Sequence, residues 1–145
     1  KNIFEINYIF VVKCCQQYIK QCLQQECSGK ILNIGSVSGL NPLSKVFTYS
    51  ASKSALHNLS KNLAREYGEK NICTNILIPG FFPAEQNKAI LSVERTQQIY
   101  NMTPMNRFGN PDELTGMVNL LASDASSFIN GSELVIDGGY NVKKI

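Results

Sequence analysis

Residues 29–39 read Gly29-Lys-Ile-Leu-Asn-Ile-Gly-Ser-Val-Ser-Gly39, and this stretch decides the fold. Its apolar run at 31–34 predicts a short buried strand, and the glycines and serines after it predict a loop. Apolar residues then recur at spacings of three and four over 47–67, which predicts a long helix. Gly68 is expected to adopt the left-handed conformation that ends many helices.

The rest of the chain continues this alternation of strands and helices. Apolar runs at 72–78 and 133–136 predict two more strands. Asn110, Pro111 and Glu113 predict a well-capped helix start. Continuous apolar strands separated by helices are typical of a parallel sheet covered on both faces, so we predict an α/β fold with a doubly wound parallel sheet. The predicted helices cover residues 1 to about 26, 83–91, 93–101 and 110 to about 123.

Composition limits the classes of function. The 145 residues suit a single domain, 1–145, and a net charge of +3 without a basic stripe predicts no nucleic-acid partner. The longest apolar run, Tyr8 to Val12, is too short to cross a bilayer, so no membrane partner is expected. The five cysteines form neither a C-x-x-C pair nor a Cys/His ligand set, which predicts free thiols, no metal and a cytoplasmic location.

Two side chains four residues apart carry the first chemical signal. Tyr49 and Lys53 project from one face of the predicted helix 47–67. A phenol is a poor acid at neutral pH, and a nearby ammonium favours its ionised form, as general acid–base catalysis requires. Alone, such a pair is more often a half-buried tyrosine beside a surface lysine. Ser36 makes the combination rarer, because it follows a predicted strand at the end where open α/β sheets bind ligands.

Several stretches together resemble one known family. Residues 29–39 and 49–53, Tyr-Ser-Ala-Ser-Lys, closely resemble the active-site strand and helix of the short-chain dehydrogenases/reductases. Residues 75–80, Asn-Ile-Leu-Ile-Pro-Gly, resemble the strand and Pro-Gly turn that this family places beside the nicotinamide. Residues 107–114 and 129–139 resemble its C-terminal helix entry and last strand. The resemblance implies the C-terminal catalytic portion of a Rossmann-like domain and an oxidoreductase that uses NAD or NADP.

The resemblance implies catalytic roles for four residues. Tyr49 is the implied general acid/base, and Lys53 the residue that assists it and binds the nicotinamide ribose. Ser36 is the implied residue that orients and polarises the substrate carbonyl. Asn7 matches an asparagine that holds a water molecule leading to the lysine, although an asparagine in a helix is often simply polar.

The resemblance also implies two sets of binding residues for the cofactor and for a small-molecule substrate. The expected cofactor-binding residues are Tyr49, Lys53, Pro79, Gly80 and Phe82. The expected substrate-binding residues are Ser36, Ser38, Glu85 and Gln86. Residues 81–87, Phe-Phe-Pro-Ala-Glu-Gln-Asn, are similar to the subgroup that acts on sugar acids such as mannonate or fructuronate, and they lack the family's usual threonine. Their polar side chains either face a polyhydroxy substrate or begin a solvated helix on a mobile lid.

One feature of the family is missing from the sequence. It contains no G-x-x-x-G-x-G turn for the cofactor pyrophosphate, so the N-terminal βαβ nucleotide-binding unit and the residues that choose NAD over NADP are expected to be absent. We therefore expect a truncated chain that is inactive by itself. The alternative is a non-catalytic remnant or oligomerising partner of the same fold that binds no cofactor.

Two expectations concern packing and surfaces. The sole histidine, His57, is expected to have a packing or surface role. The first two helices carry apolar residues beyond one stripe, Phe10 and Tyr18 on the former and Leu56 and Leu63 on the latter, a pattern typical of an interface. The family resemblance implies that these helices pair in a homodimer or homotetramer.

Overall fold

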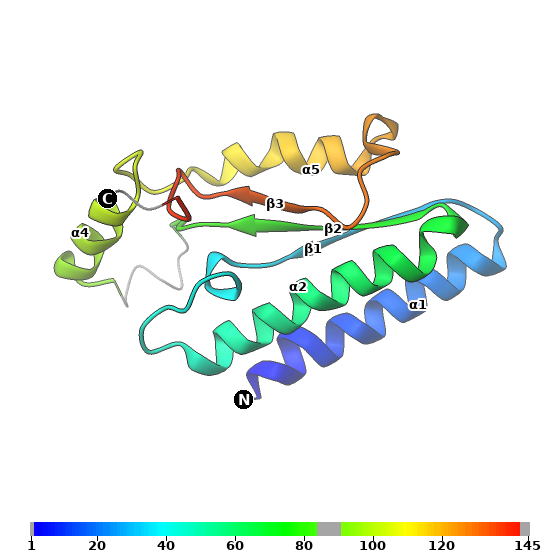
Figure 1. The fold of residues 1–145 in the computed structure, drawn as a ribbon, viewed down its shortest axis with the longest axis horizontal. Helices are drawn as coiled ribbons and strands as arrows, with labels where there is room; N and C mark the ends of the chain where they lie inside the picture. Colours follow the sequence, from blue (N-terminus) through cyan, green and yellow to red (C-terminus); the bar gives the residue numbers. More distant parts are fainter. Residues whose placement is uncertain (1, 84–90, 143–145) are drawn as a thin grey trace.

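A computed structural model describes residues 2–83 and 91–142 of the chain. Within these residues, a parallel sheet of three strands runs in the order β1-β2-β3 (Figure 1). The strands are β1 (Gly29–Ile34), β2 (Ile72–Pro79) and β3 (Glu133–Ile136). Gly29 is in register with Ile72, and Ile76 with Glu133, so the carboxyl ends of all three strands reach the same edge of the sheet. The three predicted strands and their parallel direction are confirmed.

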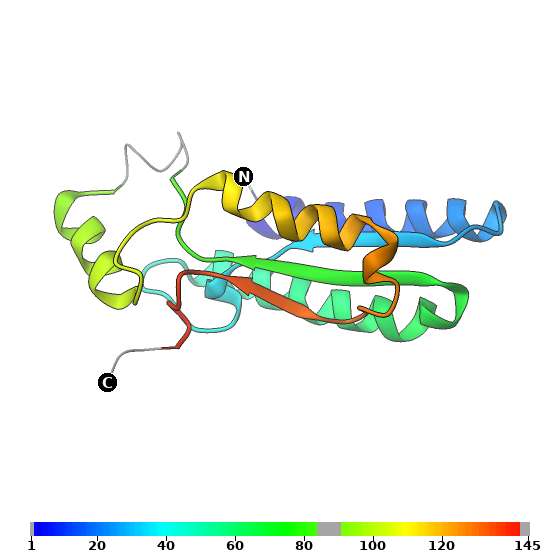
Figure 2. The same cartoon turned by 90° about the horizontal axis from the view of Figure 1, so that it is seen from above.

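Helices cover both faces of this sheet, which confirms a Rossmann-like, doubly wound arrangement. Helices α1 (Phe10–Gln24) and α2 (Phe47–Tyr67) lie side by side on one face, and α5 (Thr115–Ala122) lies on the other (Figures 1 and 2). Helix α4 (Val93–Met102) stands beyond the carboxyl ends of the strands. Shorter 3₁₀ turns occur at Val37–Gly39, Gly68–Lys70, Pro111–Leu114 and Asp124–Ser126.

Strand β2 forms the centre of the core. Ile76 and Ile78 are buried against Val37, Leu56 and Tyr140, and Ile72 is buried with Ile19 and Cys22. Leu56 is 2% exposed, so the expectation that it contributes to an interface is wrong: the helix turns this side chain toward the sheet. Phe10 is 62% exposed and does lie on the surface of α1.

The end of α2 differs from the expectation for Gly68. Gly68 has φ −59° and continues into a 3₁₀ turn, and Asn71, with φ 57°, is the left-handed residue. The glycine serves a close approach instead, because a Cβ at position 68 would lie 3.0 Å from Nδ2 of Asn130. Asn130 in turn donates from Nδ2 to the main-chain oxygen of Ala64 at 3.0 Å, which ties α2 to the segment before β3.

The helix predicted from residue 110 begins as a 3₁₀ turn and becomes α-helical at Thr115. Its predicted capping is confirmed: Asn110 Oδ1 accepts from the Asp112 N–H, and Glu113 Oε2 accepts from the Asn110 N–H. Arg107 pairs with both oxygens of Glu113, and this hydrogen bonding lowers the pKa of the Glu113 carboxyl to about 2.

Three further predictions concern the chain as a whole. The helix predicted over 83–91 falls, apart from its two ends, outside the described residues. Within the described ranges, none of the helices is long and apolar enough to cross a membrane. All five cysteines are free thiols, as predicted.

Candidate active site

The carboxyl edge of the sheet holds a cavity of about 460 Å³. Strands β2 and β3 approach closely there, because the Gly80 N–H donates to the Ile136 oxygen at 2.9 Å. A Cβ on Gly80 would lie 2.7 Å from Cα of Asp137, so this approach requires glycine. The cavity is lined by Ser36, Val37, Leu43, Val46, Tyr49, Gly80, Phe81, Phe82, Leu91, Arg95, Ile99 and Phe108. Four of the predicted site residues, distant in sequence, therefore share one cavity.

Ser36 stands between the end of β1 and the 3₁₀ turn Val37–Gly39. Its Oγ accepts from the Ser38 N–H at 3.2 Å and from the Ser38 hydroxyl at 3.0 Å. A serine oxygen has two lone pairs and one proton. Because both lone pairs are engaged, the Ser36 O–H is available to donate to a ligand in the cavity. Ser38 is buried and its hydroxyl is directed to Ser36, and its direct contact with substrate stays a prediction.

Tyr49 and Lys53 lie on the first turns of α2, and the structure brings them together as expected. Lys53 Nζ lies 5.8 Å from the centroid of the Tyr49 ring, within the range of cation–π attraction. The same nitrogen donates to the main-chain oxygen of Ile34 at 2.8 Å. Burial lowers the pKa of the Lys53 ammonium, because removal from water penalises the charged form.

Asn7 contacts the same region from the N-terminal helical segment that continues into α1 and lies beside α2. Its Nδ2 donates to Ser52 Oγ at 3.2 Å, and Ser52 Oγ donates to the Tyr49 main-chain oxygen at 2.7 Å. Asn7 lies within a π-helix, Glu5–Ile9, which the apolar spacing of the sequence does not indicate. Such turns occur frequently at functional sites. The contact places Asn7 against the turn of α2 that carries Tyr49 and Lys53, and its water-holding role stays a prediction.

Phe81, Phe82 and Phe108 give the cavity an aromatic lining. Gly109 donates its N–H to the Phe81 oxygen at 2.9 Å, and a side chain at Gly109 would overlap the ring of Phe82. The Phe81 ring packs edge-on against Tyr140 with centroids 5.0 Å apart. These contacts fix Phe82, a predicted cofactor-binding residue, on the lining of the cavity. The predicted substrate-binding residues Glu85 and Gln86 lie outside the described residues.

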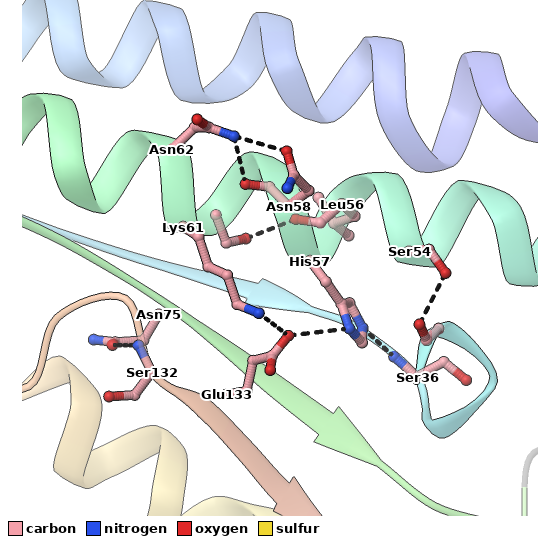
Figure 3. Close-up of polar contacts among 12 residues, drawn as sticks. Ser36, Ser54, Leu56, His57, Asn58, Lys61, Asn62, Asn75, Ser132 and Glu133 are labelled. Carbon is pink, nitrogen blue, oxygen red and sulfur yellow. Dashed lines mark hydrogen bonds and ion pairs between the residues drawn. The ribbon is translucent and has the colours of Figure 1, made fainter. Parts of the chain in front are cut away.

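Two residues of the site were not among the site residues predicted from the sequence. Arg95 of α4 is the one charged side chain among the described residues that line the cavity, and no motif marks it within the predicted helix 93–101. His57 is buried, and its Nε2 accepts the Ser36 N–H at 3.3 Å (Figure 3). Gly35 and Gly39 were the available signal for His57, because side chains at these positions would overlap its ring.

A strand-end serine and a tyrosine–lysine pair on the next helix of a parallel sheet define a class of dinucleotide-dependent oxidoreductases. A family model described as "Enoyl-(Acyl carrier protein) reductase" matches residues 1–141. The chain belongs to the short-chain dehydrogenase/reductase family, as its sequence motifs predicted.

Relatives of known structure and function span the same region. Gluconate 5-dehydrogenase of Gluconobacter oxydans is 38% identical over 138 residues, which are 94% of this chain and 53% of that protein. A gluconate 5-dehydrogenase from Burkholderia cenocepacia in complex with NADP and tartrate is 32% identical with a TM-score of 0.91, covering 96% of this chain and 55% of that one. A 4-hydroxyisoleucine dehydrogenase mutant complexed with NADH and succinate is 31% identical with a TM-score of 0.93, covering 98% and 59%. The chain thus spans little more than half the length of these relatives, and the cofactors predicted for the family, NAD or NADP, are confirmed.

The described residues fit one end of such a dinucleotide. Lys53 and Tyr49 offer polar groups beside the carboxyl end of β1, where Ile34 leaves 47% of its surface exposed. Gly80 leaves the adjoining end of β2 without a side chain. The 145 residues contain no Gly-rich turn for a pyrophosphate. Lys53 and Tyr49 are the residues that would hold the nicotinamide and its ribose, and this role stays a prediction.

Proposed function

We propose that this protein is an NAD(P)-dependent oxidoreductase that interconverts a hydroxyl and a carbonyl group on a sugar acid or related small polar acid. The observation that carries the proposal is the joint placement of Ser36 and Tyr49 on one cavity, with the Ser36 proton free to donate. The hydroxyl groups of Ser36 and Tyr49 can both hydrogen-bond to one substrate oxygen in this cavity. Family membership supports the same reaction class.

The chain's own residues perform the proton chemistry of this reaction. Ser36 donates a hydrogen bond to the substrate oxygen and orients the carbonyl. In reduction, the Tyr49 hydroxyl gives its proton to that oxygen as negative charge develops there, and in oxidation the phenolate takes the proton back. Lys53, held at the Ile34 oxygen, stabilises the phenolate through its positive charge. When bound, the nicotinamide supplies or accepts the hydride at the substrate carbon.

Arg95 supports an acidic substrate. It brings a positive charge to a cavity whose other described lining residues are apolar or neutral. A guanidinium pairs with a carboxylate in a fork of two hydrogen bonds, which neutral substrates do not offer. The relatives complexed with tartrate and with succinate hold dicarboxylates. We therefore assign Arg95 to the carboxylate of the substrate.

Steady-state kinetics test the proposal with the protein encoded by the complete gene. Keto acids of the gluconate series, a neutral ketone of similar size and a 3-oxoacyl thioester are compared with NADH and with NADPH. We expect turnover of the keto acids, and Arg95→Leu should raise KM for them by about 10- to 100-fold, since a charged hydrogen bond contributes about 1.5–3 kcal/mol. Arg65→Leu, at an exposed position on α2, is the matched control. Turnover of the thioester or the neutral ketone, but not of the keto acids, would contradict the assignment of substrate.

A second candidate is a non-catalytic protein of the same fold that acts by oligomerising. The exposed aromatic side chains of Phe10 and Tyr18 on α1 favour it, because such residues are typical of an interface. Calorimetric titration with NADH and NADPH separates the two candidates. Saturable binding by the protein encoded by the complete gene favours the enzyme, while absence of both binding and turnover favours the non-catalytic candidate.

A further inference from the structure

His57 occupies the space behind the loop that carries Ser36. The ring is 4% exposed and comes from the middle of α2, as Figure 3 shows. A Cβ at Gly39 would lie 2.9 Å from its Cε1, and one at Gly35 would overlap its Nε2. Both ends of the Ser36 loop therefore close directly onto the imidazole.

The hydrogen bond to Ser36 fixes the tautomer of this ring. The Ser36 N–H is a donor, and it lies 3.3 Å from Nε2, so Nε2 presents its lone pair. We therefore assign the ring proton to Nδ1. Nδ1 lies 3.5 Å from Oε1 of Glu133, an electrostatic contact longer than a good hydrogen bond, and it has no hydrogen-bond partner among the described residues.

Glu133 completes a chain of contacts across the sheet. Its Oε1 also lies 2.9 Å from Nζ of Lys61, one turn further along α2 (Figure 3). The carboxylate thus faces the Nδ1–H, and a negative charge there favours the tautomer that Ser36 requires. The carboxylate therefore favours this tautomer through its charge, without a hydrogen bond to Nδ1.

We propose that His57, oriented by Glu133, is a positioning residue that fixes the main chain of Ser36 so that its hydroxyl faces the cavity shared with Tyr49. The proposal rests on the proposed function of that cavity. His57 touches neither substrate nor cofactor in this role, because it acts behind the loop. The Ser38 hydroxyl donates a hydrogen bond to the side-chain oxygen of Ser36, and His57 Nε2 accepts one from the Ser36 main-chain nitrogen.

The same geometry makes the position of Ser36 sensitive to the protonation of His57. A second proton on Nε2 would face the Ser36 N–H, and two donors cannot share a hydrogen bond. The charged groups that face the ring are Glu133 from β3 and Lys61 and Lys53 from α2, and the 35–39 loop contributes none. Burial and the two lysines lower the pKa of His57 and Glu133 raises it, with burial the largest effect, so the neutral ring predominates at neutral pH.

A double-mutant cycle in the protein encoded by the complete gene tests the positioning role. His57→Leu removes the acceptor at similar volume, and His57→Gln keeps an acceptor near the position of Nε2. We expect His57→Leu to lower kcat by about 10-fold with little change in KM, and His57→Gln to restore most of it, because one hydrogen bond is worth roughly a factor of ten. The effects of His57→Leu and Ser36→Ala should be far from additive, since one acts through the other. Additive effects would contradict the proposal.

A nuclear magnetic resonance experiment decides the proposal even if His57→Leu does not fold or no substrate turns over. Long-range ¹H–¹⁵N spectra of the unmutated protein report which ring nitrogen of His57 carries the proton. A proton on Nδ1, together with slow exchange of the Ser36 amide that becomes faster in His57→Leu but not in His57→Gln, is the expected result. A proton on Nε2 would overturn the proposal whatever the activity, whereas lack of turnover with a proton on Nδ1 would overturn the proposed function alone.

Discussion

Lys53 is anchored to Ile34: its ammonium donates to the Ile34 main-chain oxygen at 2.8 Å, across the gap between α2 and the carboxyl end of β1. The anchor keeps the positive charge 5.8 Å from the centroid of the Tyr49 ring. It also keeps the charge partly out of water, and this burial lowers the pKa of Lys53. The lysine is therefore held where the proposed catalysis needs it, at some cost to stability.

Lys53→Met should stabilise the fold while removing activity. The folded-state pKa of Lys53 lies below its unfolded value, so the unfolded state binds the proton more readily and burial of the ammonium is unfavourable at neutral pH. Removing the charge should therefore raise the free energy of unfolding. Urea denaturation measures the change, with Lys20→Met on the exposed face of α1 as the control. A destabilised Lys53→Met with unchanged Lys20→Met would count against this account.

Tyr49→Phe should remove the proton donor at the substrate oxygen. Loss of general acid–base catalysis typically costs about 10²–10⁴-fold in rate. The measurement is kcat with the nicotinamide cofactor and the best keto acid, beside thermal unfolding to show that the variant folds. Retention of most of the activity in Tyr49→Phe, with complete loss in His57→Ala, would mean that the acid is not Tyr49.

The stability of the protein should decrease on acidification through His57. Its folded-state pKa is lowered, chiefly by burial, so the unfolded state takes up the proton first as the pH falls below about 6.5. The stabilisation is therefore complete above that pH and is lost as the pH falls toward the folded-state value. Free energies of unfolding at pH 7.5 and pH 5 should differ more in the unmutated protein than in His57→Gln. Equal differences would show that His57 does not titrate between these conditions.

Gly80→Ala should part the ends of β2 and β3. The added Cβ would meet the Asp137 backbone at 2.7 Å, which rotation of a side chain cannot relieve, so we expect a loss of about 1–3 kcal/mol. Gly116→Ala in α5 is the matched control, because nothing lies within 4 Å of its Cβ position and alanine favours a helix by about 0.5–1 kcal/mol. In thermal unfolding, the Tm should decrease for Gly80→Ala and increase for Gly116→Ala.

Phe10→Asp should weaken self-association, if α1 and α2 pair across a two-fold axis. Phe10 is 62% exposed, and a charge at the centre of an isologous contact meets its own copy. Leu56→Ala should instead cost about 2–5 kcal/mol of stability without changing the association of the folded molecules, because Leu56 is buried. Light scattering at several concentrations measures association, with Val93→Asp on α4 as an exposed control. An unchanged mass for Phe10→Asp would exclude this surface.

The order of helices and strands could be predicted from the sequence, because each element has its own local pattern of apolar residues. Helix α2 at 47–67 and strand β3 at 133–136 begin and end where the apolar spacing predicts. Ser36, Tyr49 and Gly80 meet because the carboxyl ends of parallel strands share one edge, a rule of topology rather than of any single residue.

The failures occur where tertiary contacts outweigh local pattern. In the sequence, Leu56 is among the apolar residues of α2 that extend beyond one stripe and suggest an interface, yet the sheet buries it. Gly68 has the composition of a helix end, yet it is present because Asn130 approaches closely, and Asn71 takes the left-handed position. His57 contacts the Ser36 loop 21 residues away in the chain, and only the glycines of that loop indicate the space that its ring needs. Arg95 lies in the predicted helix 93–101, but no motif marks it as a residue of the site.

The π-helix at Glu5–Ile9 has a consequence for how this segment tolerates insertions and deletions. A π turn holds one residue more than an α-helix in the same place, and one residue corresponds to a rotation of about 100° about the helix axis. Loss of a single codon here would regularise the helix while turning the amide of Asn7 away from Ser52. Point substitutions in this segment should therefore be accepted far more readily than changes of length.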